Sequence, residues 1–210
     1  MYVNTLQKLI VTNRWFFIPY SVLVVLALVI QFTISQFDIS LAVNSIHQPW
    51  LDVVFNFTTQ VGDGLFAAAI VLVFILFKKE YFWSSLLCFY VPSLVTQFLK
   101  RVVFTNHLRP SALMKDFTQL HYVPGVDMHE LYSFPSGHTT SAFAVFVFLA
   151  FITSNKKWGI AFLTIALLVG LSRIYLLQHF FEDVLLGSFI GVFCGTLIYA
   201  IFETNRAKLN

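Results

Sequence analysis

Long apolar runs are the feature of this sequence that most restricts its fold. A helix that crosses the hydrocarbon core of a bilayer needs about 20 apolar residues, and six stretches of the 210-residue chain reach or approach this length. Only 11% of the residues are charged and 58% are hydrophobic, whereas a soluble domain has about 25% charged residues. The sequence therefore predicts an integral membrane protein and excludes a soluble globule, a disordered chain and a secreted disulfide scaffold.

The six stretches are expected to be helices, because a backbone in lipid must satisfy its own hydrogen bonds. Their expected bounds are about 15–35, 57–77, 81–99, 138–154, 158–172 (longer if it continues past Arg173) and 184–202. A β-barrel is excluded, since the runs are continuously apolar and do not alternate with a period of two. A short interfacial helix is expected over residues 49–57. We thus predict an all-α membrane protein, a six-transmembrane bundle that forms a single domain over residues 1–210.

The distribution of charge predicts the orientation of this bundle. Eight of the 13 Lys and Arg residues flank the predicted spans on one side, together with two acids, and the other side carries five Lys and Arg residues and eight acids. The positive-inside rule then places both termini in the cytoplasm and the long connections 36–56 and 100–137 outside. A net charge of +3 is too small and too scattered to suggest nucleic-acid binding. Cys88 and Cys194 lie in apolar runs and are interpreted as packing residues.

Ionisable groups at membrane depth are costly and usually functional, and here they form three clusters on the outer side. The first is Lys100-Arg101, which ends the third predicted span, followed by Arg109-Pro110. Proline holds the preceding residue extended, and a guanidinium binds phosphate oxygens in a bidentate manner, so Arg109 is a candidate anion ligand. The alternative for Lys100 and Arg101 is a pair of cations that extend to the membrane surface.

The second cluster is Pro135-Ser136-Gly137-His138, directly before the fourth span. A glycine-containing turn that enters a helix exposes backbone N–H groups to an anion. Ser136 adds a hydroxyl donor, and His138 adds a group that titrates near neutral pH. A plain helix cap would explain the serine and the glycine but not the histidine.

The third cluster is Ser172-Arg173, His179 and Asp183. The spacing i, i+4 allows Asp183 to accept from one ring nitrogen of His179 and to leave the other free to attack. Arg173 and His179 would point about 120° apart on one ideal helix, so a break is predicted between Tyr175 and Gln178. The alternative is a structural His–Asp pair near the lipid interface.

Together the clusters supply cations, a helix N-terminus, two histidines and a carboxylate, an inventory that suits phosphoryl transfer, where positioning and charge stabilisation do most of the work. No metal or cofactor is expected. The nearest metal-like pattern, His179 with Glu182 and Asp183, lacks further ligands at a recognisable spacing. Asp127, His129 and Glu130 would have to complete this pattern across space.

The three clusters resemble the motifs of the type 2 phosphatidic acid phosphatase superfamily, which also includes glucose-6-phosphatase, bacterial acid phosphatases and vanadium haloperoxidases. The family pattern is Lys, six residues, Arg-Pro; then Pro-Ser-Gly-His; then Ser-Arg, five residues, His, three residues, Asp. The second and third parts are matched in full. In the first part, eight residues separate Lys100 from Arg109 and seven separate Arg101 from it, so the spacing leaves open which cation takes the lysine position. The resemblance covers the third to the sixth span.

The resemblance implies a role for each matching residue. His179 would be the nucleophile that forms a phosphohistidine, Asp183 would orient it, and His138 would protonate the leaving oxygen and then activate water. The implied phosphate ligands are Lys100, Arg109, Ser136, the Gly137 amide and Arg173. The acids and histidines at 107, 116, 121, 127, 129 and 130 match no family role and are expected to solvate the loop. The alternatives are that they shape the entrance or contact a head group.

Because no soluble domain is expected, the substrate should be a lipid phosphate reached from the bilayer. The candidates are undecaprenyl diphosphate, phosphatidylglycerol phosphate, phosphatidic acid and the phosphates of lipid A. Apart from this substrate and membrane lipids, no partner is expected, neither nucleic acid nor an obligate protein partner. The expected location is a bacterial inner membrane, with the site facing the periplasm. Two alternatives are a lipid phosphotransferase with the same phosphohistidine, and a lipid or anion transporter, although no inverted repeat or pair of broken spans supports the latter.

Overall fold

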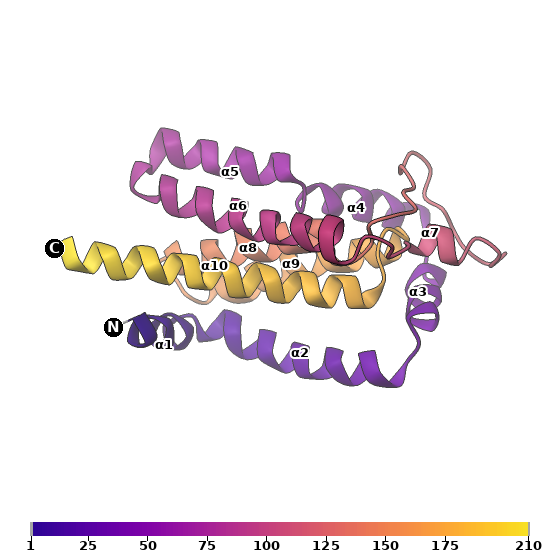
Figure 1. Cartoon of the computed structure of the whole chain (residues 1–210), viewed down its shortest axis with the longest axis horizontal. Helices are drawn as coiled ribbons and strands as arrows, with labels where there is room; N and C mark the ends of the chain where they lie inside the picture. The colour runs from indigo at the N-terminus through magenta and orange to yellow at the C-terminus, as the bar shows by residue number, and fades with distance from the viewer. Residues whose placement is uncertain (1, 210) are drawn as a thin grey trace.

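The computed structural model describes residues 2–209, which form only helices and connections. The helical elements are α1 (Tyr2–Thr12), α2 (Arg14–Thr33), α3 (Gln36–Ser45), α4 (Pro49–Gln60), α5 (Gly64–Phe77), η1 (Lys79–Tyr81), α6 (Phe82–Phe98), η2 (Leu99–Val103), α7 (Pro110–Leu113), α8 (Gly137–Ile152), α9 (Trp158–Tyr175) and α10 (Phe181–Leu209). The long helices lie side by side along one axis, with both termini at one end and α3, α4, α7 and the long loops at the other (Figure 1). The predicted all-α class is confirmed.

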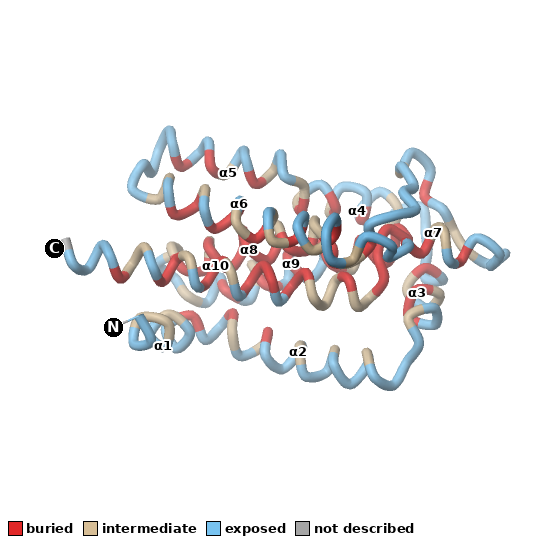
Figure 2. Tube along the Cα trace, in the orientation of Figure 1, coloured by how far each residue is buried: buried red, intermediate tan, exposed pale blue. Residues whose placement is uncertain are grey.

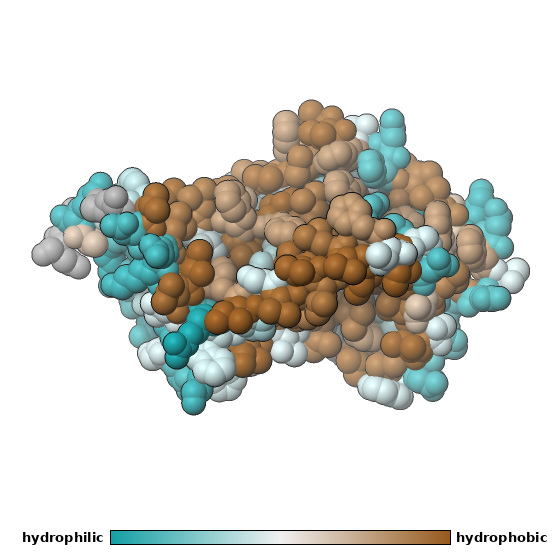
Figure 3. Space-filling model, turned by 90° about the horizontal axis from the view of Figure 1, so that it is seen from below, coloured by the Kyte–Doolittle hydropathy of each residue, from teal (hydrophilic) through white to brown (hydrophobic). Residues whose placement is uncertain are grey.

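Several of these helices can cross a membrane. Four helical segments are long and apolar enough by themselves, namely Arg14–Thr33, Lys79–Val103, Trp158–Tyr175 and Phe181–Lys208. The bent pair α4 and α5 raises the number to five, and α8 is a shorter apolar helix of 16 residues. A hydrophobic belt covers the middle of the surface, and hydrophilic residues gather towards its two ends (Figure 3). The chain is therefore an integral membrane protein.

The predicted helix over residues 57–77 is wrong, because this stretch contains a break. α4 ends at Gln60, α5 begins at Gly64, and the two helices are bent by 53°. The Asp63 carboxylate accepts a hydrogen bond from the Leu65 amide at 2.7 Å and caps the start of α5. Aspartate and glycine favour such a helix boundary. The pattern of hydrophobicity alone does not reveal it, because the residues around it are mostly apolar. The predicted interfacial helix over residues 49–57 extends to Gln60 as α4, which lies at the same end of the bundle as α3 and α7 (Figure 1).

The centre of the molecule is α8, which is buried along most of its length (Figure 2). α10 packs tightly against it through small residues. A Cβ atom added to Gly191 would lie 2.5 Å from the Thr140 carbonyl oxygen, and one added to Gly187 would lie 2.7 Å from the Ser136 oxygen. This contact brings the starts of α8 and α10 together, and the Ser136 amide donates to the Asp183 carbonyl oxygen at 2.9 Å.

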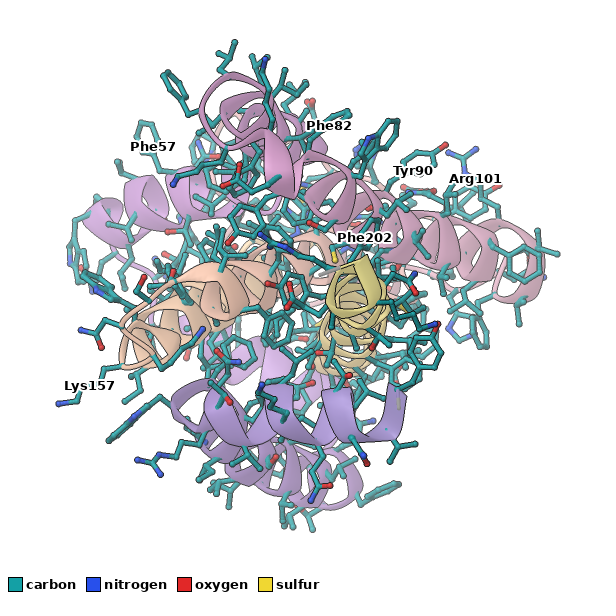
Figure 4. All side chains as sticks on the ribbon, turned by 90° about the vertical axis from the view of Figure 1, so that its left-hand side faces the viewer. Phe57, Phe82, Tyr90, Arg101, Lys157 and Phe202 are labelled. Carbon is teal, nitrogen blue, oxygen red and sulfur yellow. The ribbon has the colours of Figure 1, made fainter. Side chains whose placement is uncertain are left out.

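The other helices surround this pair. Seen from the end that carries the termini, α10 lies near the centre of the bundle, whereas Phe57, Tyr90 and Arg101 project from its periphery (Figure 4). Phe57 and Tyr90 are 74% and 57% exposed, as expected for side chains that face lipid.

Candidate active site

A cavity of about 410 Å³ collects side chains from all three sequence clusters. Six of the eight predicted site residues line it, namely Lys100, Arg109, Gly137, His138, Arg173 and His179. They come from η2, the loop before α7, the start of α8 and the region around the α9–α10 connection. Segments far apart in the sequence therefore meet around one hollow.

The carboxylate of Asp183 holds the ring of His179 at Nδ1. This nitrogen lies 3.1 Å from Oδ2 of Asp183, and both side chains are 1% exposed. The same carboxylate oxygen accepts from the Ser133 hydroxyl and from the Phe180 amide. An acceptor at Nδ1 fixes the proton there and leaves Nε2 with its lone pair.

The predicted break between Tyr175 and Gln178 is confirmed. α9 ends at Tyr175, and α10 begins two residues after His179. The turn between the two helices includes Leu177 at φ 54°, and the Arg173 carbonyl oxygen accepts from the Gln178 and His179 amides at 2.9 and 3.1 Å. His179 thus precedes the helix that carries Asp183, and the turn lets Arg173 and His179 line the same cavity.

The surroundings of His179 keep its ring neutral. Burial lowers its pKa well below the usual value near 6.5, and the positive charges of Lys100, Arg109 and Arg173 act in the same direction. A neutral imidazole with Nε2 unprotonated is the form that can attack an electrophile.

The three cations are themselves buried: Lys100, Arg109 and Arg173 are 7%, 9% and 6% exposed. Arg109 donates through Nε to the Leu131 carbonyl oxygen at 3.0 Å, and Arg173 donates to the Thr59 hydroxyl. Among the described residues, the buried Nε of Arg173 has no hydrogen-bond partner. Buried cations with a free donor are costly unless an anion joins them, so the cavity is suited to a phosphate.

The structure places Lys100, and not Arg101, at the cavity. Both lie in η2, a wide π-type turn. Lys100 is buried and lines the cavity. Arg101 projects outwards (Figure 4). Its Nε donates to Oε1 of Gln97 at 3.3 Å, and its guanidinium lies 5.9 Å from the centre of the Tyr132 ring. The turn thereby separates two adjacent cations that the spacing could not tell apart.

The start of α8 forms another wall. Gly137 lines the cavity, and a Cβ atom added there would meet nothing within 4 Å. The first N–H groups of a helix lack partners within it and favour an anion. Ser136, an implied phosphate ligand, is fully buried and does not line this cavity. Its hydroxyl caps α8 and accepts from the Thr139 hydroxyl at 2.9 Å.

Two residues that line the cavity, Thr59 and Asp63, are not among the predicted site residues. Asp63 lies 3.7 Å from Nε2 of His138, measured from its Oδ2, and Thr59 holds Arg173. A signal for them exists in the sequence, since Asn56, Thr59 and Asp63 recur at helical spacing and all line the cavity. The interpretation of residues 57–77 as one apolar span left these polar residues out of the predicted site.

The long connection before α8 contributes side chains to the cavity and does not only face solvent. Asp127 and His129 line the cavity. His121 instead contacts Asp52 at 2.9 Å and stacks on the His47 ring at 4.1 Å. Within residues 2–209, no three His, Cys, Asp or Glu side chains gather in a group that could hold a metal ion.

Comparison with known proteins identifies the family. The PAP2 superfamily matches residues 81–207, which include all three clusters. The chain belongs to the PAP2 superfamily. The resemblance inferred from the three motifs is confirmed.

Relatives of this PAP2 chain are named as lipid phosphatases. The lipid A 4'-phosphatase of Bacteroides thetaiotaomicron is 28% identical over 176 residues, which cover 79% of this chain and 76% of that protein. Phosphatidylglycerophosphatase B of Bacillus subtilis is 32% identical over 182 residues, which cover 79% of this chain and 82% of that protein. The crystal structure of a transmembrane PAP2-type phosphatidylglycerolphosphate phosphatase from Bacillus subtilis has a TM-score of 0.62 and 28% identity, and the match covers 100% of this chain and 98% of that one.

Proposed function

We propose that this PAP2 chain is a lipid phosphatase that hydrolyses the phosphomonoester or diphosphate of a membrane lipid through a phosphohistidine at His179. One observation carries the proposal. A buried neutral imidazole, held at Nδ1 by Asp183, lines the same cavity as three buried cations. The cavity therefore combines a nucleophile with a receptor for the anion that it attacks.

In the first step, Nε2 of His179 attacks the phosphorus atom. The N–P bond forms as the bond between phosphorus and the leaving oxygen breaks, and His138 gives its proton to that oxygen. Asp183 stabilises the positive charge that develops on His179. With a diphosphate substrate, the leaving group is the lipid monophosphate.

In the second step, a water molecule attacks the phosphohistidine. His138, now neutral, takes a proton from this water, the N–P bond breaks, and inorganic phosphate leaves. His179 returns to its neutral form. The net reaction is hydrolysis, and neither step draws on a metal ion.

The cations stabilise the transferred group. Lys100, Arg109, Arg173 and the amide of Gly137 would hold the non-bridging oxygens, where charge develops in the transition state. Ser136 contributes by capping the helix that presents Gly137. The carboxylate of Asp63, near His138, offsets part of the positive potential of the three cations.

The arrangement of the helices supports a reaction at one membrane surface. Residues of α4 line the cavity, and α4 lies at the end of the bundle opposite the termini (Figure 1). Eight of the 13 Lys and Arg residues flank the predicted spans on the side of the termini. We therefore propose six spans, with the α4–α5 pair and α8 as two of them, cytoplasmic termini, and a periplasmic site in a bacterial inner membrane.

The names of the relatives favour two of the candidate substrates, the 4'-phosphate of lipid A and phosphatidylglycerol phosphate. The test is phosphate release in detergent from a panel of these two lipids, undecaprenyl diphosphate and phosphatidic acid, with and without EDTA. We expect release that EDTA does not abolish and that His179→Ala lowers by about a thousandfold or more. His47→Ala, an exposed histidine outside the cavity, is the control and should keep its rate.

Wild-type rates in His179→Ala would refute the phosphohistidine. Vanadate, which mimics pentacoordinate phosphorus, should inhibit. A phosphorylated second lipid in place of free phosphate would instead identify a phosphotransferase.

A further inference from the structure

Gln178 occupies a central position that no family motif assigns. It directly precedes His179, is 2% exposed and lines the cavity. A neutral amide has no part in the proposed chemical steps. Its contacts nevertheless connect the two arginines of the phosphate site to each other and to the long loop.

The oxygen side of Gln178 faces the arginines. Oε1 accepts from Nη1 of Arg109 at 3.1 Å and from Nη2 of Arg173 at 3.5 Å. The backbone carbonyl oxygen of Gln178 accepts from the same Nη1 of Arg109 at 3.1 Å. Two guanidinium groups repel each other, so a shared neutral acceptor holds them together without neutralising the charge that a phosphate needs.

The nitrogen side of Gln178 faces the loop. Nε2 donates to the Asp127 carbonyl oxygen at 3.0 Å and to the Met128 sulfur at 3.3 Å. These contacts orient the amide, because only its oxygen can then face the arginines. The loop that lines the cavity and the two guanidinium groups are thus connected through one side chain.

We propose that Gln178 is a positioning residue, which sets the distance between the Arg109 and Arg173 guanidinium groups to that spanned by one phosphate. This inference rests on the proposed function, because it assumes that both arginines hold the transferred phosphoryl group. Preorganised donors stabilise a transition state most when they need not move during the reaction. Gln178 would therefore affect binding of a transition-state mimic more than binding of product phosphate.

Gln178→Met, which keeps the length of the side chain but removes the acceptor, tests this. We expect the inhibition constant for vanadate to rise about tenfold and that for inorganic phosphate to rise less. The matched control is Gln36→Met, which removes a half-buried glutamine that accepts from the Glu182 amide at 3.0 Å outside the cavity. This control should leave both constants unchanged, even if its melting temperature falls.

A double-mutant cycle separates positioning from general support of the fold. Arg109→Lys keeps the positive charge but removes the guanidinium that Gln178 contacts. If Gln178 acts through Arg109, the double variant should bind vanadate within about threefold of the weaker single variant. Effects that multiply would overturn the proposal, as would an unchanged vanadate constant in Gln178→Met. A wild-type chain that releases no phosphate from any lipid would instead refute the proposed function.

Discussion

At the scale of single residues, three buried cations line the same cavity as His179, the proposed nucleophile. Burial and the charges of Lys100, Arg109 and Arg173 lower the pKa of His179. The ring loses its nucleophilic lone pair when pH falls through this pKa, so kcat/KM should fall on the acid side. A lower pKa keeps the nucleophile active at more acidic pH.

The dependence on Lys100 gives a prediction with a definite sign. Lys100→Met removes a positive charge, so the pKa of His179 should rise and the acid limb of kcat/KM should move to higher pH. The rate at the optimum should also fall by about tenfold or more, because a proposed phosphate ligand is lost. The measurement is a pH profile of phosphate release.

The control for this prediction is Lys115→Met, which removes the same charge from an exposed loop position. Its profile should match that of the wild type, including any titration of the substrate itself. An acid limb that stays in place in Lys100→Met would show that His179 does not sense this cation.

At the scale of the elements, the contact between α8 and α10 aligns the site. The amide of Ser136 at the start of α8 donates to the backbone carbonyl oxygen of Asp183 on α10, and the side-chain carboxylate of Asp183 holds His179. The contact requires glycines on α10, because a side chain there would meet the backbone of α8. Helix packing and the geometry of the nucleophile are therefore coupled.

Gly191→Ala should separate these helices. The new Cβ atom would lie 2.5 Å from the Thr140 carbonyl oxygen, and overpacking of this kind costs about 1–3 kcal/mol. We expect a lower melting temperature in detergent together with a loss of phosphate release. Gly64→Ala is the matched control, since a Cβ atom there meets nothing within 4 Å. Equal melting temperatures for the two variants would contradict the role of this contact.

At the scale of the whole molecule, the candidate active site lies at one end of the bundle and eight of the 13 Lys and Arg residues flank the predicted spans at the other. The cavity is at the end with α4, α7 and the long loops, and both termini are at the other (Figure 1). An outward site would act on lipid head groups of the outer leaflet. The positive-inside rule predicts this orientation from Lys and Arg alone.

Single cysteines test the orientation. In a background without Cys88 and Cys194, Lys115→Cys in the long loop should react with a membrane-impermeant maleimide in sealed right-side-out vesicles. Lys157→Cys, in the turn between α8 and α9, should react only after permeabilisation. The reverse pattern would place the site in the cytoplasm and contradict the proposed topology.

Much of this architecture could be predicted because it depends on local sequence. Apolar runs predict helices in lipid whatever their neighbours, and the incompatible directions of Arg173 and His179 on one helix predicted the break after Tyr175. Gly137 at the entry to a helix and His179 four residues before Asp183 are likewise local features. The motifs therefore indicated the family and the candidate site before any contact was known.

Only the tertiary structure decided what depends on distant partners. It bent the chain at Asp63 and brought this carboxylate to His138, turned Lys100 inwards and Arg101 outwards, and assigned Ser136 to a cap. It also placed Gln178 between two arginines, one of them 69 residues away in the chain. Hydrophobicity and spacing describe each segment separately, whereas the partner of a buried polar group is selected by the packing of all segments together.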